Sequence, residues 1–176
     1  MKNLTKWIAT VATTAAIFFS VNVNAQINYE SPWRLGFGIE SGIPTGALHS
    51  SPAYSKFELG GTARLQYEVN KNVALTFTSG YYNFFATQAV KDAGGENFGV
   101  VPVKAGAKAF VTDNVYVAGE AGVGFETSYT KVKKLILSPG IGWTDKTWDL
   151  ALRYENFSRR GNYGLVALRL AYGFSL

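Results

Sequence analysis

The final nine residues, LRLAYGFSL at 168–176, alternate strictly between large apolar side chains and small, charged or polar ones. This two-residue period is the pattern of a β-strand, because successive side chains of a strand point to opposite faces. Chain ends are usually polar and poorly ordered, so an alternation that persists to the last residue predicts a strand with one face in apolar surroundings. The apolar row consists of Val166, Leu168, Leu170, Tyr172, Phe174 and Leu176.

Seven earlier segments show the same alternation, and turn-forming residues separate each from the next. They are 33–42, 57–69, 73–82, 100–111, 115–125, 135–143 and 148–157, and the terminal strand is expected over 163–176. Alternating segments of about ten residues are the signature of transmembrane β-barrels. The composition agrees, because only 16% of the residues are charged, against about 25% in ordinary soluble domains.

The connections between these segments alternate in length. Tight turns are expected at 70–72, 112–114 and 145–147, and longer loops at 43–56, 83–97, 126–134 and 158–162. Outer-membrane barrels have short turns at one end and longer loops at the other, and an even strand count puts both termini at the short-turn, periplasmic end. The sequence therefore predicts an all-β fold: an eight-stranded antiparallel up-and-down transmembrane β-barrel over 33–176, with 26–32 as a periplasmic lead-in.

Residues 1–25 have the composition of a secretory signal peptide. Lys2 and Lys6 make the start basic, an apolar stretch follows, and the small-residue segment 23–25 ends it. This pattern predicts export and cleavage before Gln26, with an uncleaved helix as the alternative. Without these two lysines, 15 of the 17 basic residues are left against 12 acidic ones. The resulting net charge of +3 is no sign of nucleic-acid binding.

The charged residues of the eight segments lie on the faces opposite the apolar ones. They are Arg34, Glu40, Glu58, Arg64, Glu68, Lys104, Lys108, Glu120, Asp149, Arg153, Glu155 and Arg169. In a soluble lipocalin-like barrel the apolar faces would line an internal ligand cavity, whereas in a membrane barrel they would face lipid. Many small residues share the charged faces, which suits a narrow lumen, and aromatic residues gather near the strand ends like interfacial girdles. Both features favour the membrane barrel, with the soluble barrel as the alternative.

Four segments resemble a family of outer-membrane proteins. GIESGIPTG at 38–46, VPVKAGAKAF at 101–110, SPGIGW at 138–143 and DLALRYENFS at 149–158 are similar to the outer membrane protein β-barrel domain family common in Gram-negative Bacteroidota. The resemblance covers about residues 33–176 and lies in the order and spacing of the segments. It implies an eight-stranded barrel in the outer membrane. It implies no reaction, since most members of that family have no assigned function.

The expected lumen holds six basic and six acidic residues, in an interior that side chains of an eight-stranded barrel can fill. We expect these groups to pair, because an unpaired buried charge is costly. Glu120 is expected in mid-lumen, paired with Lys104 or Lys108 of the adjacent strand. A paired lumen predicts a polar plug, so the protein would act as a structural or surface-interaction scaffold that displays four loops. A narrow pore for small ions or solutes is the alternative.

The sequence offers little for catalysis. His49, the single histidine, lies in the first long loop beside Ser50 and Ser51, but a serine triad needs a third group to hold its base. We expect no catalytic residue, and a lipid-modifying barrel enzyme stays as an alternative. One histidine without any cysteine leaves no metal site. The glycine patterns at 122–125 and 140–142 lie within strands, where no helix follows to bind a phosphate, so no cofactor is expected.

Two groups of residues point to partners. The loop cations Lys131, Lys133, Lys134, Arg159 and Arg160 are suited to bind lipopolysaccharide phosphates, although ordinary loop solvation explains them as well. The terminal row over 168–176 resembles the signal that the outer-membrane barrel assembly machinery recognises. We therefore expect outer-membrane lipids and this machinery as partners, a monomer, and no nucleic acid.

Overall fold

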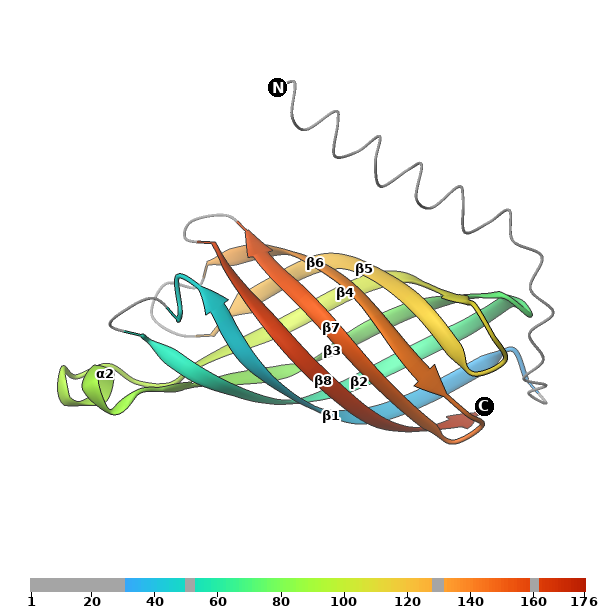
Figure 1. The fold of residues 1–176 in the computed structure, drawn as a ribbon, viewed down its shortest axis with the longest axis horizontal. Coiled ribbons are helices and arrows are strands. Elements are labelled where there is room, and N and C mark those ends of the chain that lie inside the picture. The colour runs from blue at the N-terminus through green and yellow to red at the C-terminus, as the bar shows by residue number, and fades with distance from the viewer. Residues whose placement is uncertain (1–30, 50–52, 128–131, 159–161) are drawn as a thin grey trace, which may run out of the picture.

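The computed structural model describes residues 31–49, 53–127, 132–158 and 162–176. The predicted signal peptide at 1–25 and its cleavage site lie outside the described residues. Eight antiparallel strands form a closed barrel in which each strand pairs with its neighbours in sequence and the last pairs with the first (Figure 1). The all-β eight-stranded fold predicted from the alternation is confirmed.

The strands span much of the described chain. They are β1 (Trp33–Gly46), β2 (Ser55–Asn70), β3 (Val73–Ala86), β4 (Phe98–Phe110), β5 (Val115–Glu126), β6 (Lys133–Thr144), β7 (Trp148–Ser158) and β8 (Tyr163–Ser175). A short helix, α2 (Gln88–Asp92), interrupts the connection between β3 and β4. No helix in the described part of the chain is long and apolar enough to cross a membrane.

The two ends of the barrel differ. Connections at 71–72, 111–114 and 145–147 form one end, here called the turn end, and those at 47–54, 87–97, 127–132 and 159–162 form the loop end. The C-terminus lies at the turn end (Figure 1). The strands around the first two long loops extend further than predicted. Residues 43–46 of β1 still pair with β8. At the second loop, Phe84 of β3 pairs with Phe98 of β4.

The seam between β1 and β8 closes the sheet. It runs from Arg34 opposite Ser175 at the turn end to Gly46 opposite Tyr163 at the loop end. Closure leaves no strand edge unpaired, which is the condition for a sheet to lie in an apolar medium.

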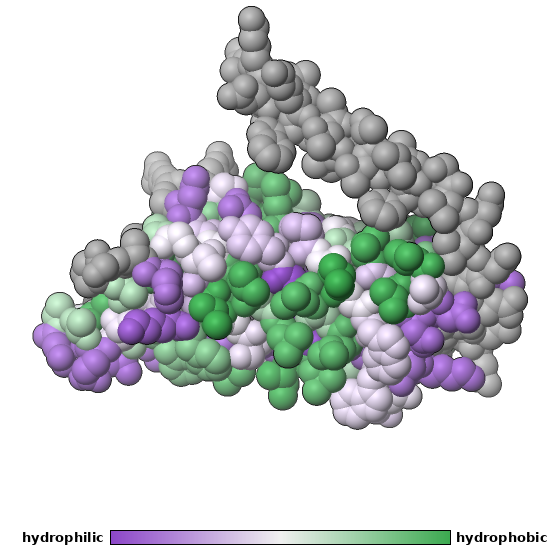
Figure 2. Space-filling view, viewed as in Figure 1, coloured by the Kyte–Doolittle hydropathy of each residue, from purple (hydrophilic) through white to green (hydrophobic). Residues whose placement is uncertain are grey.

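Apolar side chains cover the outside of the barrel, and Figure 2 shows them gathered over its middle with hydrophilic residues toward both ends. The outward row of β8 illustrates this, with exposed fractions from 41% at Phe174 to 60% at Leu176. The alternation predicted an apolar row on one face of this strand, and the structure places that row outside. The apolar faces therefore do not line an internal cavity, contrary to the lipocalin-like alternative.

Aromatic side chains lie on the outer surface near both ends. At the turn end, the rings of Trp33 and Tyr67 are 4.8 Å apart and those of Trp148 and Tyr172 are 5.5 Å apart. At the loop end, Phe57 stacks on Phe85 across the β2–β3 pair at 5.8 Å. Such belts at two levels are typical of transmembrane barrels, whose aromatic rings sit at the two membrane–water interfaces.

Candidate functional site

The lumen collects the charged side chains of six strands. Eleven of the twelve charges that the sequence places on the inner faces are buried: Arg34, Glu40, Glu58, Arg64, Lys104, Lys108, Glu120, Asp149, Arg153, Glu155 and Arg169. Glu68, near the turn end of β2, is only partly buried. The inner face of β3 and the middle of the inner face of β6 carry no charged residue. They contribute hydroxyl groups to the lumen instead, such as those of Thr78 and Ser138. The lumen is therefore filled with polar side chains from all around the barrel.

Arg153 of β7 lies between three glutamates. Its Nη1 is 3.0 Å from Oε2 of Glu120, its Nη2 contacts Oε2 of Glu40, and the same nitrogen is 3.7 Å from Oε1 of Glu155. Glu155 is also paired with Lys104, whose Nζ donates to the Tyr82 hydroxyl at 3.0 Å. One guanidinium group thus joins carboxylates from β1, β5 and β7.

Glu120 of β5 is the most fully satisfied carboxylate of the lumen. It accepts hydrogen bonds from the hydroxyls of Thr78 at 2.7 Å and Thr76 at 3.0 Å. Its Oε1 lies 3.2 Å from Nη2 of Arg64, and its Oε2 lies 3.7 Å from Nζ of Lys104. The predicted pairing with a lysine is present, but the arginines lie closer, and the spacing in the sequence did not indicate them.

Asp149 of β7 is shared by three cations nearer the turn end. Lys108 pairs with it directly, Nη1 of Arg169 lies 3.3 Å away, and Nη1 of Arg64 lies 4.0 Å away. The Tyr116 hydroxyl donates to the same carboxylate at 2.9 Å. Because Arg64 contacts Asp149 as well as Glu120, the ion pairs form one continuous network.

Little space is left inside this network. Two cavities between the charged side chains measure about 20 and 10 Å³, roughly the room that a single water molecule needs. Among the described residues, the network therefore leaves room for about one water molecule at each of these two places.

A mainly aromatic cluster, here called the aromatic cap, lies inside the barrel at the loop end. It consists of Tyr82, Phe84, Val100, Ile136, Phe157, Tyr163, Leu165 and Ala167, with Leu48 and Phe98 packed against it. Phe84 stacks on Phe98 at 4.6 Å, and Phe157 stacks on Tyr163 at 4.7 Å. The sequence pattern predicts Phe84 in the loop at 83–97, which is wrong, because β3 continues to Ala86. The inward parity of β3, continued past its predicted end at 82, is the signal that identifies Phe84.

Solved structures share this eight-stranded fold. The crystal structure of Ail, the attachment invasion locus protein of Yersinia pestis, matches with a TM-score of 0.56 at 15% identity, over 82% of this chain and 99% of that one. Neisserial surface protein A, NspA, matches with a TM-score of 0.54 at 12% identity, over 83% and 98%. The N-terminal β-barrel domain of Pseudomonas aeruginosa OprF matches with 0.54 at 8% identity, over 82% and 98%. The fold is that of a small outer-membrane barrel.

These likenesses concern the fold, because the sequences are far apart. No family model matches the chain, and no curated protein matches it. Eight-stranded outer-membrane barrels enclose a lumen just wide enough for side chains to fill, and the charge network described above fills this one.

Lys134 corrects the expectation that the cations of the third loop face outward. Both Lys133 and Lys134 belong to β6, whose alternation turns Lys134 into the barrel, where it is 4% exposed. Its Nζ lies 3.9 Å from Glu126 and 5.3 Å from the ring centre of Tyr163. Lys133 is exposed, with its Nζ 5.7 Å from the ring centre of Phe125. The other expected lipid contacts, Lys131, Arg159 and Arg160, lie outside the described residues.

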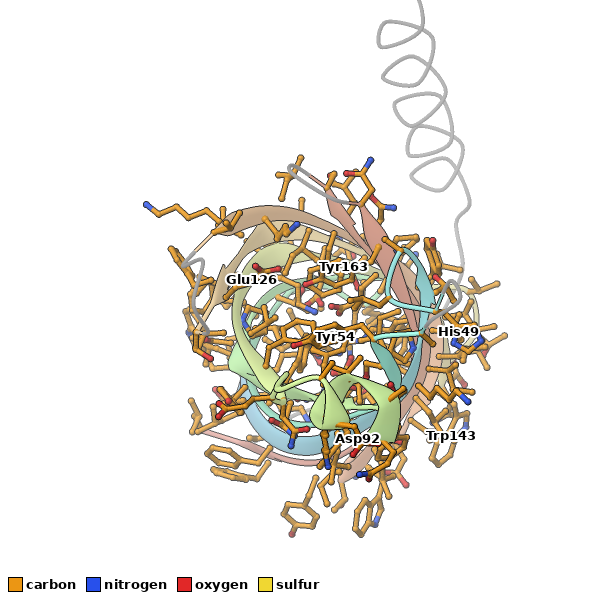
Figure 3. All side chains as sticks on the ribbon, turned by 90° about the vertical axis from the view of Figure 1, so that its left-hand side faces the viewer. His49, Tyr54, Asp92, Glu126, Trp143 and Tyr163 are labelled. Atoms are coloured by element: carbon orange, nitrogen blue, oxygen red, sulfur yellow. The ribbon has the colours of Figure 1, made fainter. Side chains whose placement is uncertain are left out.

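The loops of this barrel are tied to one another at its mouth. The Tyr54 hydroxyl donates to the carbonyl oxygen of Glu96 at 2.8 Å, and the Thr87 hydroxyl donates to that of Ala53 at 2.7 Å. Figure 3, viewed from the loop end, shows Tyr54 and Tyr163 across the mouth. The first and second loops thus form one joined unit above the cap, with α2 projecting beyond it (Figure 1).

His49 lies exposed in the first loop, where its backbone N–H donates to the carbonyl oxygen of Gly46 at 3.0 Å. In Figure 3 it lies at the rim, apart from Asp92 of α2. Its neighbours Ser50 and Ser51 are outside the described residues. Within the part of the chain that the structure describes, no three His, Cys, Asp or Glu side chains are grouped so as to hold a metal ion.

Asp145 organises the last tight turn. Its Oδ1 accepts hydrogen bonds from the backbone N–H groups of Trp148 and Thr147, each at 2.6 Å. These two bonds, the one from Trp148 first, lower the pKa of the exposed Asp145 carboxyl below its usual value of 3.8. Arg34 donates from Nη1 to the Asp145 carbonyl oxygen at 3.0 Å, which joins the turn to the lumen.

Proposed function

We propose that the protein is an integral outer-membrane barrel that serves as a closed scaffold for surface interactions. The observation that carries the proposal is the double closure of the lumen by the aromatic cap and the charge network. A barrel filled in this way gains stability from its interior and offers no route for solutes. Its loops are then the part available to partners, and the link between Tyr54 and Glu96 holds two of them together.

The membrane orientation follows from the two ends. In outer-membrane barrels short turns face the periplasm and longer loops face outward, so the turn end would be periplasmic. Outer-membrane lipids would contact the apolar exterior, and the barrel assembly machinery would recognise the outward row of β8. The fold shared with Ail, NspA and the OprF domain supports this location.

We also propose membership of the outer membrane protein β-barrel domain family. The segments that carry the resemblance, 38–46, 101–110, 138–143 and 149–158, fall within β1, β4, β6 and β7. They include Glu40, Lys104 and Arg153, three members of the charge network.

Gel mobility of the outer-membrane fraction tests the location and the folded barrel together. Intact barrels resist detergent until they are boiled, so unboiled and boiled samples should migrate differently. We expect this shift in material that stays in the membrane after a urea wash. A soluble protein without a shift would overturn the proposal.

Planar-bilayer recordings then separate the scaffold from the narrow pore. The purified barrel should give no reproducible conductance steps under conditions in which a known porin does. Steps of constant size that scale with protein concentration would instead establish the pore.

A substitution of His49 tests the remaining alternative, that the protein is a lipid-modifying enzyme. Since no partner for a triad accompanies it in the described residues, His49→Ala should leave membrane lipid composition unchanged. A loss of a modified lipid in the variant, with normal barrel assembly, would show that the scaffold proposal is incomplete.

A further inference from the structure

The cavity nearer the turn end has an unbalanced lining. Its charged and amide lining residues are Arg34, Arg64, Gln66, Lys108, Asp149 and Arg169, and small residues of β1 and β8 complete it. Four of these side chains are cationic and one is a carboxylate. All six are buried, with none more than 6% exposed.

The single carboxylate of the lining, Asp149, already has several partners. Asp149 takes Lys108, Arg169 and Arg64 within 4.0 Å and also accepts from the Tyr116 hydroxyl. Arg64 has a nearer carboxylate in Glu120, at 3.2 Å, whereas Lys108 and Arg169 share Asp149. Two cations that share one anion repel each other, and burial weakens the screening that water would provide. Glu68 interacts electrostatically with Arg34 and Lys108 from the barrel edge but does not line the cavity.

Two donors at the cavity lack acceptors. Nη2 of Arg169 and Nε2 of Gln66 are buried without a hydrogen-bond partner, and their residues are 1% and 2% exposed. A buried donor without an acceptor costs free energy comparable to a lost hydrogen bond, and more when it is charged. Two cations on one carboxylate, together with two donors that lack acceptors, make this cavity suited to an anion.

We propose that this cavity, called here the anion site, binds one small inorganic anion of the size of chloride. Its volume of about 20 Å³ is close to the room that a water molecule needs, and chloride is only slightly larger. The closely packed lining favours a single-atom anion over polyatomic ones such as phosphate or sulfate. The anion would accept hydrogen bonds from Arg169 and Gln66 and offset the charge that Asp149 leaves unbalanced. An anion bound in the interior is a property beyond the proposed role as a scaffold.

Equilibrium urea unfolding of the full barrel in detergent tests the anion site. Sodium chloride is titrated against sodium gluconate at constant ionic strength, because gluconate cannot enter the cavity. We expect chloride to stabilise the barrel with a saturating dependence, so that the unfolding equilibrium constant falls about tenfold when chloride reaches ten times its dissociation constant. Equal stability in the two salts would overturn the proposal.

Gln66→Glu supplies the missing anion covalently, in a side chain of the same shape. We expect this variant to match the chloride-bound wild type in stability and to lose its dependence on chloride. Glu58→Gln is the matched control, because Glu58 is a buried lumen residue that lines neither cavity. It should keep the chloride dependence of the wild type. Chloride dependence that persists unchanged in Gln66→Glu would contradict the assigned site.

Bromide gives a readout that does not depend on the folding of a variant. Crystals of the wild-type barrel grown in sodium bromide should show an anomalous peak between Arg169 and Gln66. A water molecule without anomalous signal at that position would overturn the proposal, since water satisfies the donors but not the charge.

Discussion

Glu120 and Glu58 are both buried carboxylates of the lumen, and they differ in what surrounds them. Glu120 accepts from two threonine hydroxyls and has two arginine side chains within 3.3 Å. Neither oxygen of Glu58 has a hydrogen-bond partner, although the side chain is completely buried. A buried charge is tolerated when it is paired and costly when it is not, so the two positions contribute to stability in opposite directions.

Replacing each carboxylate by its amide separates these cases. Glu120→Gln leaves Arg64 and Arg153 with less compensating charge, and we expect the free energy of unfolding to fall by about 3–5 kcal/mol. Glu58→Gln removes no hydrogen bond and relieves the repulsion from Glu40 and Glu155, so stability should stay the same or rise. Urea unfolding of both variants in the same detergent measures the difference, and similar losses at the two positions would contradict it.

At the scale of the strand, two of the three glycines of β5 have opposite surroundings. A Cβ at Gly122 would lie 2.0 Å from the carbonyl oxygen of Val103 on β4, whereas a Cβ at Gly119 would meet nothing within 4 Å. The first clash is with backbone and cannot be relieved by a change of rotamer.

Alanine at these two positions is therefore a matched pair. Gly122→Ala should force β4 and β5 apart and destabilise the barrel by about 3 kcal/mol or more. Gly119→Ala should be neutral or slightly stabilising, because alanine loses less backbone entropy on folding. The fraction of heat-modifiable protein after refolding measures both, and a normal barrel from the Gly122→Ala variant would refute the steric account.

The stability of the turn between β6 and β7 should depend on pH through the carboxyl group of Asp145. Its folded-state pKa is lowered by backbone hydrogen bonds, so the charged form stabilises the turn above the unfolded pKa. This contribution is lost as the pH falls through the folded pKa.

Asp145→Asn isolates the effect of that charge. The wild type should be the more stable at pH 7, and the difference should shrink as the pH drops below about 4. Unfolding midpoints across this range measure it; a difference that is constant with pH would show that the charge is irrelevant to the turn.

The outward row of β8 has a separable role in assembly. Phe174, 41% exposed on the outer surface, contributes little to the lumen, so Phe174→Ser should refold in detergent nearly as well as the wild type. In cells, we expect its membrane-inserted fraction to fall several-fold if the assembly machinery reads this row. Val117→Ser, an outward position on β5, is the control, and equal losses for both variants would argue against a terminal signal.

For the whole molecule, the aromatic cap and the charge network lie one after the other along the lumen, and we propose that each closes it. Removing the stacked rings of the cap with Phe84→Ala and Phe157→Ala opens the loop end but leaves the ion pairs of Arg153 and Glu120 in place. We expect no conductance steps from this double variant, although its stability should fall by several kcal/mol, as large-to-small substitutions of buried phenylalanines generally do. Reproducible steps would show that the cap alone seals the barrel.

The alternation along the chain was sufficient to predict the closed barrel and the inward charges, because a strand repeats every two residues and one face had to be apolar. It was not sufficient at the loop end. The pattern predicts Phe84 and Lys134 in loops, because it ends β3 too early and starts β6 too late, and only the parity of the longer strands turns both side chains inward. The sequence also did not indicate which cations pair with Glu120. Its nearest cations are arginines of β2 and β7. Their distance from Glu120 depends on closure of the barrel and not on spacing in the sequence.

The seam between β1 and β8 joins the first and last strands of the barrel. Arg34 and Ser175 pair across it, although they come from opposite ends of the barrel sequence, and such non-local contacts form slowly. Until they form, both strands present open edges that can pair with other chains. We expect seam closure to be the rate-limiting step of folding, and an intermediate that lacks the seam to aggregate unless a chaperone covers its apolar strands.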